Sequence, residues 1–146
     1  MANTGTPNEE SADLSGAAAA FIRADLACTF GPSFFLRQLA RFVRDHCPTP
    51  EEHLPMVQVR LADGEVLDVC HIIGVSPRWV ILAVRNAAGH QGMVIEIVPF
   101  ELVRRISISA RRADGASIGF AQTHVPNIMT AEALLHAATA VAEAEA

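Results

Sequence analysis

Residues 56–109 carry the pattern that most constrains the fold of this chain, because apolar residues recur there in short runs divided by turn residues. In the first run, Val57, Val59 and Leu61 alternate with polar side chains. This period of two is typical of a half-buried β-strand, because successive side chains of a strand point to opposite faces. We therefore expect this region to form a small β-sheet.

Turn signals divide the region into five predicted strands. Asp63-Gly64 is a strong hairpin signal, and Gly74 lies inside a long run, where a glycine often marks a sharp bend at a barrel corner. The third run is apolar on both faces, which favours a central position in the sheet. The predicted strands span residues 56–61, 65–75, 79–86, 93–98 and 102–108. Together they predict a five-stranded antiparallel barrel of the SH3-like kind.

The segments on either side of the strands have a helical pattern. Ile22, Leu26 and Phe30 recur at every fourth position and are followed by a Gly-Pro stop. A second predicted helix over 34–46 has an apolar face and an arginine face, and a threonine cap precedes a final predicted helix over 131–142. The fold class is therefore α+β. The expected divisions are a mobile tail (1–11), a helical extension (12–54), the barrel (55–112) and a C-terminal extension with a helix (113–146).

Composition excludes several classes of protein. The chain is 51% hydrophobic and 18% charged, which fits a globular domain rather than a disordered one. Cys28, Cys47 and Cys70 are odd in number and lack the spacing of a disulfide framework or a zinc site. No run approaches the roughly 20 apolar residues of a membrane span, and the acidic N-terminus is unlike a signal peptide. We expect a cytoplasmic protein without membrane association, metal or cofactor.

The order and spacing of these runs resemble the Sm-like superfamily, and its Hfq-like branch in particular. A helix with Phe-Leu-Arg-Gln-Leu at 35–39 precedes the strands, and the run at 57–64 is similar to the first strand and its Asp-Gly turn. The Trp-Val-Ile-Leu run at 79–82 resembles the start of the third strand, and residues 102–106 resemble the closing strand. The resemblance covers about half of the chain.

The resemblance implies a surface for single-stranded RNA. Trp79 occupies the place where the family stacks a base on an aromatic ring, and arginines on the same face are expected to meet phosphates. The Lys-His pair that contacts uridine in the Hfq-like branch is replaced here, since Val98, Pro99 and Phe100 stand at the end of the fourth strand. RNA binding is therefore expected to be weak. The candidate RNA-binding residues are Trp79, Arg78, Arg104, Arg105, Phe100 and Gln38.

The resemblance also implies assembly. In Sm-like proteins the fourth and fifth strands remain as edges that pair with neighbouring subunits, which closes a ring of six or seven copies. Here residues 93–98 form a flat apolar run, and such an edge aggregates unless it is paired or covered. Coverage of this edge by residues 113–146 is the alternative.

Three interpretations stay open at this point. The first is a non-catalytic Sm-like ring that binds RNA weakly, and the second is an Sm-fold assembly module that binds protein and no RNA. The third is a small barrel that forms no ring. A net charge of −5 does not demand a nucleic-acid partner, although residues 55–112 hold seven arginines against five acidic residues. No motif predicts an enzyme, because no catalytic triad, carboxylate pair or phosphate-binding loop has suitable context.

Overall fold

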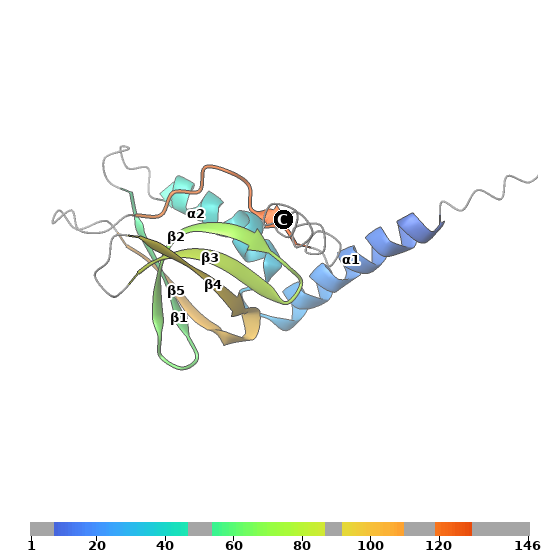
Figure 1. Cartoon of the computed structure of the whole chain (residues 1–146), viewed down its shortest axis with the longest axis horizontal. Coiled ribbons are helices and arrows are strands. Elements are labelled where there is room, and N and C mark those ends of the chain that lie inside the picture. The colour runs from blue at the N-terminus through green and yellow to red at the C-terminus, as the bar shows by residue number, and fades with distance from the viewer. Residues whose placement is uncertain (1–7, 47–53, 87–91, 110–118, 130–146) are drawn as a thin grey trace, which may run out of the picture.

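The computed structural model of the chain describes residues 8–46, 54–86, 92–109 and 119–129, with side chains from Gly16 onward. A long first helix leads into a helical pair that precedes the sheet (Figure 1). The helical elements are α1 (Asn8–Ala27), the π-helical turn η1 (Phe34–Gln38), α2 (Leu39–His46) and the 3-10 turn η2 (Phe100–Leu102). The strands are β1 (Met56–Leu61), β2 (Val66–Val75), β3 (Trp79–Arg85), β4 (Met93–Pro99), β5 (Val103–Ser109) and β6 (Asn127–Ile128).

The α+β class and the five predicted strands are confirmed, each within about two residues of its predicted bounds. The turn between β1 and β2 contains Gly64 at φ 91°, a left-handed conformation that glycine adopts without strain. Strand β3 lies between β2 and β4, and residues 80–84 are all buried. A strand covered on both faces and paired on both sides needs the continuous apolar sequence that predicted its central place.

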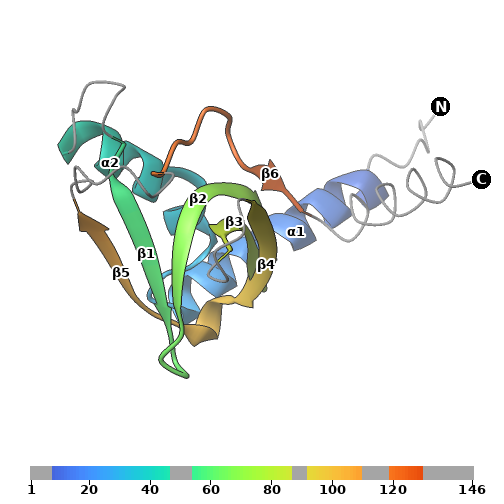
Figure 2. The same ribbon diagram turned by 60° about the vertical axis from the view of Figure 1, so that its left-hand side comes forward.

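The closed barrel is a wrong prediction. The five antiparallel strands form an open sheet in the order β4-β3-β2-β1-β5, and a short sixth strand, β6, runs parallel to β2. Strands β4 and β5 are therefore the two ends of the sheet, and Figure 2 shows them on opposite sides of the molecule. Strong bending of β2, rather than closure, wraps the sheet around its core. The predicted helix over 131–142 lies outside the described residues.

The bend in β2 has a local cause. The register between β2 and β3 shifts between Val69 and His71 and again between Ile72 and Gly74, so the longer strand carries extra residues. Such bulges bend a strand and increase its twist. The predicted bend near Gly74 is thus confirmed. The first half of β2 pairs with β1, and the second half pairs with β3 and, at Gly74 and Val75, with β6.

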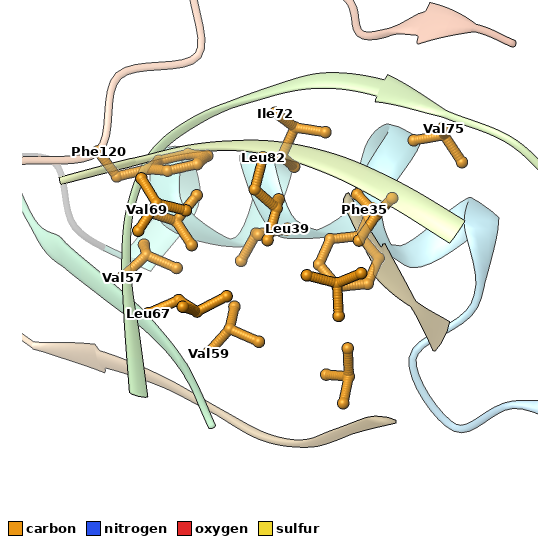
Figure 3. Packing of buried hydrophobic residues seen from close by; sticks show 14 of the residues in the cluster. Phe35, Leu39, Val57, Val59, Leu67, Val69, Ile72, Val75, Leu82 and Phe120 are labelled. Carbon is orange, nitrogen blue, oxygen red and sulfur yellow. The ribbon is translucent and has the colours of Figure 1, made fainter. Parts of the chain in front are cut away.

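The core lies inside this bend, with η1 and α2 packed on it (Figure 3). Phe35, Leu39 and Val43 of the helices are buried against the inner faces of the strands. Fully burying one such side chain stabilises the fold by about 1.5–3 kcal/mol. Phe42 is 50% exposed, and the centroid of its ring lies 4.2 Å from that of the His46 ring. The buried positions of η1 and α2 are thus spaced four residues apart.

Helix α1 begins at Asn8, which is earlier than the expected position near residue 12. At its other end, Asp25 accepts hydrogen bonds from the backbone N–H of Ser33 at 2.9 Å and from the Ser33 hydroxyl. A Cβ at Gly31 would lie 2.8 Å from the Asp25 carboxylate, so a glycine is needed at this crossing. The junction fixes α1 relative to the sheet.

A segment after the sheet, residues 119–129, covers the bent half of β2, and we call it the strap (Figure 2). Phe120 is 3% exposed and belongs to the core. The Gln122 side chain accepts a hydrogen bond from the Ile72 N–H at 2.7 Å and donates one to the Ile72 carbonyl at 3.0 Å. Strand β6 then pairs with Gly74 and Val75. The strap therefore supplies hydrogen-bond partners for backbone N–H and C=O groups of β2 that lie beyond the residues paired with β1.

Candidate nucleic-acid interface

The Ser76–Trp79 turn positions two of the predicted site residues. Ser76 is buried, and its Oγ accepts hydrogen bonds from the backbone N–H groups of Arg78 at 3.0 Å and Trp79 at 2.9 Å. The Ser76 N–H also donates to the Trp79 carbonyl at 2.9 Å. A serine hydroxyl thus stabilises this turn in the manner of an Asx side chain. The result is an exposed Arg78 next to a half-buried Trp79.

A second contact brings the end of β4 to this turn. The Phe100 N–H donates to the Arg78 carbonyl at 3.2 Å, so η2 lies against the turn. The Phe100 side chain, however, is 2% exposed, and its ring lies 5.9 Å from that of Phe35 in the core. The Phe100 ring therefore packs in the core beneath the turn, and its face is not free to stack on a base.

A hollow of about 630 Å³ opens between this corner and α1. Its volume falls within the roughly 300–1,000 Å³ of small-ligand sites. Polar and aromatic groups converge on it from three elements that are far apart in sequence. The side chains that give it this character are Arg23, Cys28, Arg78, Trp79 and Glu101.

Arg104 lines a second hollow of about 290 Å³. The two hollows share Cys28, Phe100 and Glu101, so they adjoin each other. Arg104 thus lies close to the Trp79 site.

Two of the predicted residues are not brought to this site. Arg105 lies opposite Arg60 in the β1–β5 register, and Gln38 is exposed on η1. Neither residue lines either of the two adjoining hollows.

Arg23 of α1 was missed by sequence reasoning, which treated that helix only as an extension. The available signal was a small-residue face, because Ala20, Ala24 and Ala27 flank Arg23 at helical spacing and also line the hollow. Small side chains allow the helix to lie close to the corner, and the one long side chain reaches into the hollow.

The charge around the two hollows is positive, with three arginines against Glu101. Among the side chains that the structure describes, the one ion pair joins Arg44 and Asp45 at 3.9 Å, so these arginines are not neutralised by a bonded carboxylate. Guanidinium groups beside a half-exposed aromatic ring can hold a phosphate and a stacked base.

The two described cysteines differ in their surroundings. Cys28 is partly exposed at the hollow, whereas Cys70 is buried in β2, where its carbonyl accepts a hydrogen bond from the Ala121 N–H at 2.9 Å. Burial, with a smaller contribution from Asp68, raises the pKa of the Cys70 thiol, and Arg85 partly opposes this rise. Over the described ranges, no group of three or more histidine, cysteine or acidic residues could hold a metal ion. Nor is any helix there long and apolar enough to cross a membrane.

Comparison of the chain with protein-family models, with curated proteins and with solved structures finds no significant match in any of the three. The residues and the geometry of the two hollows are therefore the basis on which the function of this chain is inferred.

Proposed function

We propose that this chain is a non-catalytic Sm-like protein that assembles into a ring and binds single-stranded RNA weakly beside Trp79. The observation that carries the RNA part is the convergence of Arg23, Arg78 and Arg104 on adjoining hollows, the larger of which is also lined by Trp79. Stacking of one base on an aromatic ring contributes about 1–3 kcal/mol, and arginines add sequence-independent phosphate contacts.

The assembly part rests on the two ends of the sheet. The resemblance implies that the fourth and fifth strands are free edges, and β4 and β5 are the end strands of this sheet. Met93, Ile95 and Ile97 of β4 are 54–64% exposed. Exposed apolar residues on an edge strand favour pairing with another chain. Six or seven copies, joined edge to edge in the cytoplasm, is the assembly that the resemblance implies.

The weakness of RNA binding follows from the small number of cations. Contacts from three arginines to phosphates give a slope of about −2 for log K against log salt with single strands. Over a fourfold rise in salt this amounts to a loss of roughly 20-fold in affinity. Since the whole chain carries a net charge of −5, long-range attraction adds little.

The test is a fluorescence titration of Trp79 with short oligo-U and oligo-A at low and moderate salt. Trp79 is the single tryptophan, and the chain has no tyrosine, so the signal reports this site alone. We expect saturable quenching, and the affinity derived from it should weaken as the salt concentration rises. In Arg78→Ala this affinity should be about tenfold lower than in the wild type. Arg41→Ala removes an exposed arginine of α2 that lines neither hollow, and it should bind as the wild type does.

A protein-assembly module without RNA binding is the second candidate, and the exposed apolar residues of β4 favour it independently of Trp79. A flat titration with both oligomers, together with an assembled protein free of nucleic acid after purification, would support this second function and contradict the first.

A further inference from the structure

Strand β4 carries a half-buried charge in the middle of its apolar edge. Glu96 is the fourth of seven residues in β4 and lies opposite Leu82, a fully buried residue of β3. The alternation of the strand places Glu96 on the inner face with Val94 and Val98. In the described part of the chain, Glu96 has no ion-pair partner. Partial burial of a carboxylate without a partner is unfavourable, so a cation supplied from outside would stabilise this edge.

Strand β5 carries the opposite charge. Arg104 and Arg105 are consecutive and exposed, and the strand holds no acidic residue. The register shift between Arg60 and Leu61 leaves Arg104 as the extra residue of a bulge, which brings two guanidinium groups to the same end of the edge. Arg105 also faces Arg60 across the strands, and like charges in such a pair are destabilising. An acidic partner would relieve this repulsion.

We propose that Glu96 of one copy pairs with Arg104 and Arg105 of the next, and that this contact makes copies join β4 to β5 and prevents β4 from joining β4. This inference rests on the proposed self-assembly and names its selecting residues. Antiparallel pairing of two β4 strands about their centres would place Glu96 opposite Glu96. The same centred pairing of β4 with β5 places Glu96 opposite Ile106, and Arg104 is then two residues away on β5, a diagonal distance that a long side chain can span. Opposed like charges exclude a wrong partner more effectively than opposite charges strengthen the right one.

Heterologous pairing has a consequence for the shape of the assembly. When β4 of one copy joins β5 of the next, each dimer still has one unpaired β4 and one unpaired β5. Further copies can therefore add until a ring closes or a filament forms. Pairing of β4 with β4 would stop at two copies.

Charge reversal tests the pairing. In sedimentation velocity at low salt, Glu96→Arg and the double variant Arg104→Glu/Arg105→Glu should each associate at least about tenfold more weakly than the wild type. A mixture of the two variants should reassemble, because each supplies the charge that the other needs, and the triple variant should assemble alone. A variant that failed to fold could not be rescued by mixing, so recovery also controls for stability.

Matched control variants make the same change in net charge at positions outside β4 and β5. Glu65→Arg lies in the exposed hairpin turn, and Arg41→Glu/Arg44→Glu lies on the exposed face of α2. Both should assemble like the wild type.

Assembly of Glu96→Arg at wild-type strength would overturn the pairing while leaving the proposed function intact. Stronger association of Glu96→Gln than of the wild type would also overturn the proposed pairing. It would show that the charge of Glu96 prevents β4 from pairing with another chain. A wild-type protein that stays monomeric would contradict the assembly itself, and this outcome is distinct from the other two.

Discussion

The bent half of β2 and the edge of β4 differ in whether another segment of the chain covers them. The bent half of β2 is covered by the strap, which fills the core with Phe120, bonds Ile72 through Gln122 and adds β6. The edge of β4, by contrast, has no covering segment among the described residues and presents Ile95 and Ile97 at 64% and 61% exposure. An edge strand is a hazard wherever it occurs. One edge is thus closed within the chain, and the other is the edge that the proposed assembly would use.

The largest expected effect comes from removing the anchor of the strap. Phe120→Ala deletes a ring that is 3% exposed, and such substitutions cost about 3–5 kcal/mol. Chemical denaturation of the variant should show this loss in the free energy of unfolding. A loss below about 1 kcal/mol would mean that the strap is only loosely attached and that β2 is effectively a second free edge.

A smaller loss is expected from the polar clamp. Gln122→Ala removes the hydrogen bonds to the Ile72 N–H and carbonyl and should cost about 1–3 kcal/mol, because these backbone groups lose their partner. Hydrogen exchange at the Ile72 amide should accelerate while exchange in β1 stays slow. Unchanged exchange at Ile72 would show that the clamp does not protect this edge.

The contrast predicts that the β4 edge matters for assembly and hardly at all for folding of the protomer. Ile95→Lys should change the free energy of unfolding by less than about 0.5 kcal/mol, since the side chain is 64% exposed, yet it should abolish association. Val125→Lys is the matched control, because Val125 is an exposed apolar residue of the strap at 81%. Equal assembly of both variants would contradict a role for β4.

The smallest effect appears only at alkaline pH. Because burial raises the pKa of Cys70, the folded protein holds the thiol proton more tightly than the unfolded chain does. The resulting stability is fully present below the ordinary thiol pKa of about 8.5 and is lost as the pH rises through the higher folded pKa. The free energy of unfolding should therefore fall above about pH 8.5, and it should fall less in Cys70→Ala. Identical slopes in both proteins would show that the buried Cys70 thiol does not contribute to the pH dependence of stability.

Local patterns explain what the sequence could predict. The strands were found because alternation and turn residues such as Asp63-Gly64 lie within a few positions of each other. Trp79 and Arg78 come together for the same reason, since one short turn holds both.

Distant contacts explain what it could not predict. Whether β4 pairs with β5 depends on how sharply β2 bends. The alternation of apolar residues does not encode this angle, so the sequence pattern predicts a closed barrel where the structure has an open sheet. Gln122 bonds Ile72 fifty residues away, and a lone glutamine carries no signal for such a contact. Arg23 likewise reaches the site only because the Asp25–Ser33 junction directs α1 past the Trp79 corner.

Self-assembly through the β4 edge is tested most directly by the native mass of the wild-type protein, measured at micromolar concentration and again after dilution. We expect a closed assembly of several copies of the 15.6 kDa chain, six or seven as the Sm-like resemblance implies, and we expect Ile95→Lys to reduce it to single chains. A wild-type mass of 15.6 kDa at every concentration would contradict it, because the exposed edge of β4 would then have no second copy to cover it.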